Sequence, residues 1–538
     1  MWPETPTDYS FKFHMSPQQY DVVVVGSGNA GFSAAVSAKE SGADRVLLLE
    51  KAPESWAGGN TTFTAGAYRT VFHGLEDVLP IVCNVTPDVA AKIDMQPYTE
   101  DDFMGDLKRV TNGRTHPELA TALVRESNAT TKWLAKNGIK FVLSFNRQAY
   151  EIDGRFKFWG GMVLSVKNGG KGLTQQHQAN AHRKGVEVRY DSAVVKILSK
   201  DTGEIQGVTV RRKDGTLYDV LAKGGVVLCA GGFEANAKMR AQNLGAGWDL
   251  AYVRGTPHNT GDLLNLAMGL GAKPAGNWSG CHSTCWDANA PTDAGDQLLT
   301  NQYTKSGYPL GLMINTNGER FVNEGIDLRN YTYAKFGREI LRQPDSVAFQ
   351  VWDADGVRWL RKEEYADDVV ERMEADTIEE LSKKLAGKGL RSPEAFMTTL
   401  EEYNAAVKAH REENPDIVFD PSKKDGLSTR SSRGGLKLEK TNWALPIVKG
   451  PFLAVKVTCG VTFTFGGLKT DPTNSAVVSE YNKLIPGLFC AGEMVGGLFY
   501  DNYPGGSGLT SGAVFGRKAG RAAAERAAAS GVRLRSSL

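Results

Sequence analysis

The chain has 538 residues, of which 41% are hydrophobic and 23% charged, and its formal net charge is +2. This length exceeds what one hydrophobic core supports, so two or more domains are expected. The balanced charge, without a dense lysine or arginine run, excludes an electrostatic nucleic-acid binder, and no apolar stretch is long enough for a membrane span.

The six cysteines are scattered and form no CxxC pair, which favours a reducing compartment. Cys281 and Cys285 flank His282, but no second pair of ligands accompanies them, so no metal site is expected. The N-terminal segment lacks a basic stretch followed by an apolar run and does not resemble a signal peptide. We therefore expect a cytoplasmic protein.

The first predicted elements are a buried strand, a glycine-rich turn and a helix within residues 20–42. The segment 21–25 contains four successive valines after Asp21, which is typical of a buried parallel strand. Gly26, Gly28 and Gly31 follow with the G-x-G-x-x-G spacing. The first permits a tight turn, the second lets the backbone approach a pyrophosphate, and the third lets helix and strand pack closely. The helix N terminus offers free N–H groups to the phosphates.

A second apolar run at 46–49 ends in Glu50, which lies 19 residues after Gly31. An acid at this place can accept hydrogen bonds from both ribose hydroxyls of a dinucleotide. If the glycines served only helix packing, Glu50 would have no explanation. The segment therefore predicts a dinucleotide site, without distinguishing NAD from FAD.

The far parts of the sequence favour FAD. Residues 224–236 form a buried strand that ends in two glycines, and residues 484–493 form a short strand that ends in Glu493. A glycine-rich turn then leads into a long helix from about Gly508. Glu493 would hold a ribityl hydroxyl, and the positive end of the helix would face the flavin edge that gains negative charge on reduction.

Three motifs add a specific resemblance. They are GGNTTFTAG at 58–66, NTNGERFVNEGIDLRN at 315–330 and GGLFYDNYPGGSGL at 496–509. With them, the chain resembles the fumarate reductase/succinate dehydrogenase flavoprotein superfamily from Tyr20 to about Ala528. Within it, TNWALPI, GVTFTFGG and NYPGGSGL are most similar to tricarballylate dehydrogenase-like proteins, which oxidise a tricarboxylate across a CH–CH bond.

The resemblance implies an α/β fold, with a Rossmann-like FAD-binding domain interrupted by an α+β capping domain. We expect the FAD-binding domain at 18–276 and 450–530 and the capping domain at 277–449. A helix at 261–276 would precede the first boundary, and charged helices such as 366–388 would lie in the cap. Substrate is expected between cap and flavin.

The resemblance also implies which residues contact FAD. The expected contacts are Gly26, Gly28, Asn29, Ala30, Gly31, Glu50, Lys51, Gly58, Gly59, Asn60, Thr61, Ala65, Gly66, Val194, Ala230, Gly231, Gly232, Gly492, Glu493, Ser507, Gly508 and Leu509. Respiratory members attach the flavin to a histidine in the loop after the ribose acid. Residues 56–70 contain none, and His73 lies just outside, so we expect non-covalent FAD.

Arg329 and His282 are the first two candidate catalytic residues. Arg329 stands where fumarate reductases carry their proton-transferring arginine, yet a guanidinium with a pKa above about 12 is an unusual base. Its other role is a carboxylate clamp. His282 occupies the place of the family's substrate-binding histidine. Arg320 is expected to be structural, paired with Glu324.

Tyr503 is the third candidate, because the sequence departs from the fumarate reductase pattern there. Fumarate reductases have an arginine at this position, a histidine where Thr462 and Phe463 stand here, and a relay acid that has no match within TNQYTKSGYPLG. Fumarate itself is therefore not the expected substrate. A tyrosine in a YPGG turn resembles the ketosteroid dehydrogenases, in which a tyrosine hydroxyl polarises a ketone.

Three functions remain open from the sequence. The first is a dehydrogenase or reductase of a polycarboxylate. The second is a desaturase of a ketone-bearing substrate, with Trp159, Trp278, Trp286 and Phe463 lining an apolar pocket. The third is a non-redox flavoprotein acting as an isomerase or assembly module. Without iron–sulfur motifs, electrons would leave to oxygen, a quinone or a separate partner protein.

Overall fold

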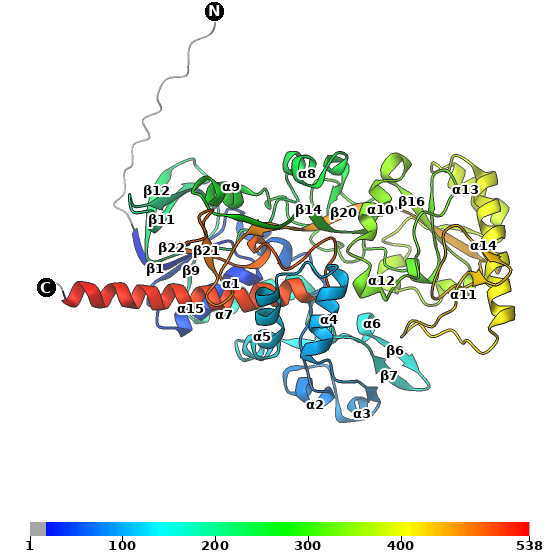
Figure 1. Ribbon diagram of the computed structural model, residues 1–538, viewed down its shortest axis with the longest axis horizontal. Helices are drawn as coiled ribbons and strands as arrows, with labels where there is room; N and C mark the ends of the chain where they lie inside the picture. The colour runs from blue at the N-terminus through cyan, green and yellow to red at the C-terminus, as the bar shows by residue number, and fades with distance from the viewer. Residues whose placement is uncertain (1–17, 537–538) are drawn as a thin grey trace, which may run out of the picture.

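The structure is a computed structural model that describes residues 18–536 (Figure 1). The segment before residue 18, for which no signal peptide is predicted, lies outside the described residues. Within the described part, no helix is both long enough and apolar enough to cross a membrane.

An eight-stranded sheet is built from both ends of the chain. Its strands are β1 (Gln18–Val25), β2 (Val46–Leu49), β9 (Glu187–Arg189), β10 (Ser192–Ser199), β11 (Ile205–Arg212), β12 (Leu217–Leu228), β21 (Ala476–Val478) and β22 (Leu484–Cys490). The order is β10-β11-β12-β1-β2-β9, with β22 beside the end of β12 and β21 beside β22. The strands β9, β2, β1, β12 and β22 are parallel. Residues 22–25 of β1 and all four residues of β2 are buried, and their sequences are continuously apolar because both faces of the sheet are covered there.

Two helices pack side by side against this sheet: α1 (Asn29–Glu40) and α15 (Ser507–Ser536), the long red helix in Figure 1. Glycines at every fourth position of α15 allow the close approach. A Cβ at Gly516 would lie 2.5 Å from the Ala30 carbonyl oxygen, and one at Gly520 would lie 2.0 Å from that of Ala34. The contact joins the first and last parts of the chain.

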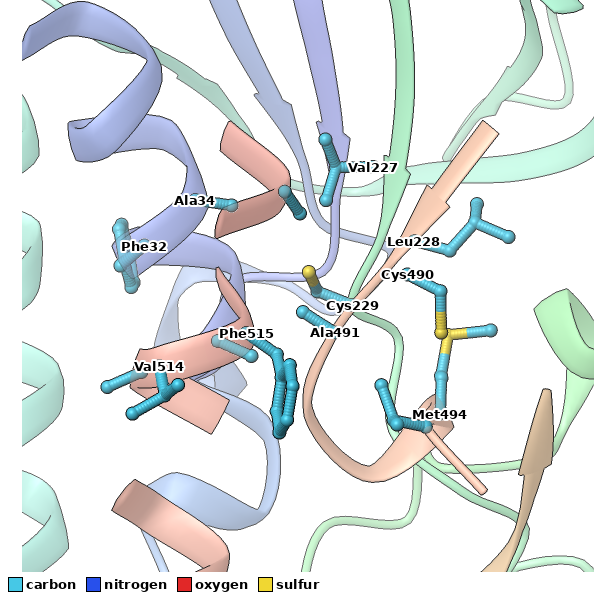
Figure 2. Close-up of a cluster of buried hydrophobic side chains, with 14 of the residues drawn as sticks. Phe32, Ala34, Val227, Leu228, Cys229, Cys490, Ala491, Met494, Val514 and Phe515 are labelled. Atoms are coloured by element: carbon cyan, nitrogen blue, oxygen red, sulfur yellow. The ribbon is translucent and has the colours of Figure 1, made fainter. Parts of the chain in front are cut away.

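Figure 2 shows the core beneath this junction. Phe32 and Ala34 come from α1, and Val514 and Phe515 come from α15. Leu228 and Cys490, the last residues of β12 and β22, complete the cluster together with Cys229 and Met494, which follow these strands. The strand ends that carry the predicted cofactor motifs are thereby fixed to both helices.

A six-stranded sheet, with the helices that cover it, forms a second part of the molecule. Its strands are β13 (Tyr252–Val253), β14 (Pro274–Asp287), β15 (Leu312–Asn315), β16 (Ala348–Trp352), β17 (Met373–Ala375) and β20 (Phe452–Leu468). The segment 277–449, called the cap below, contains the α-helices α10 (Phe336–Leu341), α11 (Ala354–Val357), α12 (Lys362–Tyr365), α13 (Ile378–Ala386) and α14 (Pro393–Glu413).

The long strand β20 belongs to both parts of the molecule. Its first half pairs with β16 and β17, and its residues Phe452, Leu453, Ala454, Val455 and Val457 belong to the two hydrophobic cores of the cap. Its second half pairs with β13 and most of β14, and Cys459, Val461 and Phe465 belong to the core of the first sheet. The two parts therefore share one continuous strand.

The remaining elements surround these sheets. The small sheets contain β3 (Ala67–Tyr68), β5 (Phe141–Leu143) and β8 (Leu164–Val166); β4 (Ile93–Asp94), β6 (Ala149–Ile152) and β7 (Arg155–Phe158); and β18 (Arg430–Ser431) and β19 (Gly434–Gly435). The remaining α-helices are α2 (Leu75–Val78), α3 (Pro87–Ala90), α4 (Glu100–Val110), α5 (Pro117–Lys136), α6 (Phe145–Gln148), α7 (Gly169–Arg183), α8 (Ala237–Leu244) and α9 (Asp262–Gly269). The 3₁₀ helices are η1 (Glu54–Trp56), η2 (Gly59–Thr61), η3 (Leu79–Ile81), η4 (Trp248–Leu250), η5 (Tyr308–Leu310), η6 (Arg329–Tyr331), η7 (Pro344–Ser346) and η8 (Gly492–Met494).

Two predicted helices are shorter than expected. The helix at 261–276 ends at Gly269, because Gly271 has a left-handed φ of +83° and β14 begins at Pro274. The boundary proposed at 276/277 therefore lies inside a strand. Within 366–388, residues 373–375 form the edge strand β17, and helix α13 begins only after Thr377, whose side chain caps it.

Candidate functional site

A cavity of about 260 Å³ is lined by the β1–α1 turn, the C-terminal glycine-rich segment and residues of the cap. Arg329, His282 and Tyr503 all lie in its wall. Most of the predicted cofactor contacts line it too, namely Gly26, Gly28, Asn29, Ala30, Glu50, Lys51, Gly59, Asn60, Thr61, Ala65, Val194, Ala230, Gly231, Gly492, Glu493, Gly508 and Leu509. The structure thus brings both sets of residues to one cavity.

Five predicted contacts do not line the cavity: Gly31, Gly58, Gly66, Gly232 and Ser507. The four glycines serve packing, because a Cβ on any of them would lie within 3 Å of a protein atom. At Gly31, for example, it would be 1.9 Å from the Gly26 carbonyl oxygen. Ser507 is buried, and its hydroxyl donates to the carbonyl oxygen of Pro504 at 2.6 Å.

Gly28 indicates how closely a ligand must approach the turn. Its φ is −73°, which any residue can adopt, and a Cβ there would meet Thr61 Oγ1 only at 3.4 Å. Neither backbone conformation nor protein packing therefore requires glycine at this cavity-lining position. A pyrophosphate lying against the backbone at the start of α1 does require it, so the turn fits FAD.

Glu50 is fixed in the orientation that the ribose would need. Its Oε2 accepts hydrogen bonds from the Ser27 backbone N–H at 2.9 Å and from the Ser27 hydroxyl at 2.7 Å. Its Oε1 accepts one from the Ala52 N–H at 2.8 Å. A carboxylate has about four acceptor positions, so Glu50 keeps capacity for a ribose hydroxyl in the cavity that it lines.

Glu493 is the second buried carboxyl of the cofactor end. Its Oε1 accepts from the Thr464 backbone N–H at 2.6 Å and from the Thr464 hydroxyl at 2.9 Å. Burial raises the pKa of Glu493, and burial together with the Glu493 charge raises the pKa of its neighbour Glu234. Asn60 and Asn259 donate to Glu234, which holds the 58–66 loop beside the cavity.

Elsewhere in the cavity wall, where the sequence predicts the substrate, two tyrosines form a hydroxyl pair beside His282. The hydroxyls of Tyr333 and Tyr503 are 2.7 Å apart, and the His282 ring lies 4.9 Å from the Tyr333 ring and 5.3 Å from the Tyr503 ring. Burial raises the pKa of both tyrosines. Burial and the nearby charge of Arg254 lower the pKa of His282 to about 3, so its imidazole is neutral at neutral pH.

Arg329 and three further arginines line this end: Arg147, Arg254 and Arg361. Arg329 Nη2 donates to the backbone carbonyl oxygen of Arg147 at 2.7 Å, and Arg361 Nη2 contacts the same oxygen at 3.4 Å. The three further arginines lie in other segments of the sequence than Arg329, and none of these segments carries a recognisable motif. Only the tertiary structure identifies them.

Glu364 brings a carboxylate to a segment that contains no acidic residue of its own. It lies on α12, and its Oε2 accepts from the Ser306 backbone N–H at 3.0 Å and from the Ser306 hydroxyl at 2.5 Å. Ser306 belongs to the segment TNQYTKSGYPLG, which has no match for the relay acid of the fumarate reductases. Although burial alone would raise it, the pKa of Glu364 is lowered by the charges of Arg361 and Arg147.

The aromatic residues proposed for an apolar pocket do not come together. Phe463 lines the main cavity, whereas Trp159 lines a smaller adjoining pocket, with which the cavity shares Ser306, Arg329, Arg361 and Glu364. Trp278 stacks on Phe233 with ring centroids 5.7 Å apart, and Trp286 is fully buried. Trp278 and Trp286 therefore serve packing, a role that composition could not distinguish.

The remaining predicted residues lie as follows. Arg320 Nη2 is paired with Glu324 Oε2 at 2.5 Å, away from the cavity wall. His73 is exposed and is not part of the lining. Among the residues that the structure describes, no group of three histidine, cysteine, aspartate or glutamate side chains could hold a metal ion.

Comparisons with known proteins bear on the cofactor and on the fold. The family model described as "FAD binding domain" matches residues 21–509. The chain is 28% identical to the probable fumarate reductase Ifc3 of Shewanella frigidimarina, over 94% of this chain and 75% of that protein.

Two solved structures resemble the whole fold. The open conformation of a flavocytochrome c3 fumarate reductase matches with a TM-score of 0.69 and 25% identity, over 95% of this chain and 79% of that chain. A 3-ketosteroid delta1-dehydrogenase from Sterolibacterium denitrificans matches with a TM-score of 0.70 and 20% identity, over 95% of this chain and 100% of that chain. The second likeness concerns the fold alone.

Proposed function

The chain belongs to the FAD binding domain family and to the fumarate reductase/succinate dehydrogenase flavoprotein superfamily, and from that premise we propose its substrate. It is an FAD-dependent oxidoreductase that acts on CH–CH bonds. We propose that its substrate is a polycarboxylate such as tricarballylate, which it dehydrogenates to the alkene, or whose alkene it reduces.

The observation that carries this proposal is the group of four arginines at the substrate end of the cavity. They face one buried carboxylate, Glu364, and a histidine that is neutral. A wall with this excess of positive charge suits an anionic substrate, because guanidinium groups bind carboxylates with two parallel hydrogen bonds. A neutral ketone would leave most of these charges without a counter-charge.

The proposed chemistry divides between cofactor and protein. Bound FAD supplies the acceptor for a hydride from one carbon, while a proton leaves the neighbouring carbon. We propose that one hydroxyl of the Tyr333–Tyr503 pair donates this proton when the alkene is reduced and is left as a tyrosinate beside the positive charge of Arg254. In dehydrogenation the tyrosinate form accepts the proton. One O–H is used within the pair, so the other is available to the cavity. Arg329 then serves as a carboxylate clamp, and neutral His282 orients the substrate or the tyrosines.

Two further assignments belong to the same proposal. The capping domain, 277–449, encloses the substrate against the FAD-binding parts at 18–276 and 450–530. The FAD is bound non-covalently, and a quinone or a separate partner protein exchanges electrons with it. All six cysteines are free, and five of them are buried.

The ketone-desaturase alternative is favoured by one observation. Tyr503 and Tyr333 both line the cavity, and their hydroxyls are hydrogen-bonded to each other. One of these hydroxyls could donate to a ketone oxygen and polarise the carbonyl group. The four arginines weigh against it, because an apolar ketone offers them no partner. A non-redox role has no particular contact in its favour.

The proposal is tested by anaerobic reduction of the purified holoenzyme with light, followed by stopped-flow mixing with acceptors. We expect propene-1,2,3-tricarboxylate to reoxidise the flavin rapidly, while the saturated tricarboxylate does not. Rapid reoxidation by an enone, without any by alkene carboxylates, would replace the proposal with the ketone alternative. Reoxidation by neither would favour a non-redox role.

A further inference from the structure

The arginines of the cavity differ in whether the protein already neutralises them. Arg361 Nη1 is 2.7 Å from Glu364 Oε1, so this pair is internally compensated. Among residues 18–536, no ion pair within 4 Å involves Arg147, Arg254 or Arg329. Three guanidinium groups thus face the cavity without a carboxylate partner from the protein.

Arg254 is the most deeply buried of the three. Arg254 directly follows β13, and its Nη1 donates to the Thr462 hydroxyl at 3.0 Å. Its Nε is buried without a hydrogen-bond partner among the described residues, and its guanidinium lies 5.4 Å above the Trp286 ring. Burying a charge without a counter-charge is costly unless an anion joins it.

Arg147 reaches the same space from helix α6. Its backbone oxygen accepts the bonds from Arg329 and Arg361, while its own guanidinium has no hydrogen bond among the described residues. Burial and the charge of Arg361 lower the pKa of Arg147 to about 10, so it stays protonated at neutral pH. Like charges converge here, as expected for a preformed anion site.

We infer that Arg147 and Arg254 determine substrate specificity, and that together with Arg329 they provide one guanidinium for each carboxylate of a three-carboxylate substrate. The inference rests on the proposed function and deepens it. A dicarboxylate would leave one of the three groups buried and unpaired. The site therefore selects tricarboxylates over dicarboxylates by charge compensation rather than by size alone.

Matched ligands allow the assignment to be tested one carboxylate at a time. Propane-1,3-dicarboxylate lacks the central carboxylate of propane-1,2,3-tricarboxylate, and propane-1,2-dicarboxylate lacks a terminal one. Binding to the oxidised holoenzyme is measured by calorimetry and by the change in flavin absorbance. We expect the wild-type protein to bind the tricarboxylate about 10- to 100-fold more tightly than either dicarboxylate.

The variants are Arg254→Met and Arg147→Met, with Arg342→Met as the control. Arg342 is a cap arginine whose side chain is 65% exposed and pairs with Glu339. Each cavity variant should weaken tricarboxylate binding about 10- to 100-fold. Each variant should scarcely weaken binding of the dicarboxylate that lacks the carboxylate paired with the replaced arginine. Replacing the arginine and omitting that carboxylate remove the same interaction, so their effects do not add. The control should bind as wild type does.

Flavin content and melting temperature establish that the variants fold, and Arg254→Lys replaces Arg254→Met if the latter loses its flavin. Wild-type tricarboxylate affinity in both cavity variants would overturn the inference and leave the proposed function standing. If flavin-loaded wild-type protein binds no polycarboxylate and is reoxidised by none, the proposed function itself fails.

Discussion

Tyr503 and Arg329 face the same cavity, but the protein uses their polar groups differently. The Tyr503 hydroxyl is committed to the Tyr333 hydroxyl, which fixes its position. Among the described residues, the Arg329 guanidinium makes one hydrogen bond, to a backbone oxygen, and its other N–H groups remain available. A fixed hydroxyl suits proton exchange, whereas a guanidinium with free donors suits carboxylate binding.

The two roles predict opposite kinetic effects. Arg329→Lys should raise KM and largely keep kcat, because it weakens a contact made in both ground and transition states. Tyr503→Phe should lower kcat by about 10²–10⁴-fold, the usual contribution of a positioned proton donor or acceptor. Single-turnover flavin reduction by a tricarboxylate, across pH, separates the two effects. A collapse of kcat in Arg329→Lys would assign the proton to the arginine instead.

At the scale of elements, helix α4 holds the two loops that carry these residues. Asp106 accepts from the hydroxyls of Tyr331 at 2.7 Å and Tyr98 at 2.6 Å, and lies 3.1 Å from Arg69 Nη1. Arg109 pairs with Asp327, next to the loop of Arg329. Just beyond the helix, Arg114 pairs with Asp501, next to Tyr503. One helix thus positions residues from two distant segments.

Asp106→Ala should destabilise the protein strongly, because it leaves the fully buried Arg69 without its carboxylate. Breaking a buried pair in this way costs about 3–5 kcal/mol. Asp94→Ala is the matched control, because its pair with Arg155 is exposed to solvent and exposed pairs contribute little to stability. Urea unfolding of both holoenzymes measures the difference. Equal losses would show that the α4 network contributes no more than a surface pair.

Sequence patterns predicted the elements whose roles are local. The run at 21–25, the glycine turn and Glu50 lie close together in the chain, so their spacing alone indicates a nucleotide site. The partners of Tyr503 could not be predicted in this way. Tyr333 lies 170 residues away, and no motif marks it. The strand at 373–375 was missed because its pairing partner, β20, lies far along the chain.

At the scale of the whole molecule, the cofactor cavity is enclosed by both ends of the chain and by the cap. Its lining runs from Val25 to Gly512. The two histidines in the lining are His258 and His282, whereas His73 is exposed and outside it. Retention of FAD is therefore expected to depend on folding rather than on a covalent bond.

Acid precipitation should accordingly release FAD from the yellow protein into the supernatant. The reason is that unfolding separates the segments that enclose the cofactor. Absorbance of the supernatant and of the pellet measures the partition, and His73→Ala should give the same partition as wild type. Yellow colour retained in the wild-type pellet but lost in His73→Ala would identify that histidine as a covalent attachment site.

The continuous strand β20 constrains how this protein can exchange parts with its relatives. A recombinant that replaces only residues 277–449 would divide β14 between two parents, within the stretch where Gly276 pairs with Gly466 and Asn277 with Phe465. Crossovers in the loops 270–273 and 469–475 would instead transfer β14 and β20 together, with their ladder intact. The transferable unit of this fold is thus larger than the cap, and it includes the strand that reaches the flavin side.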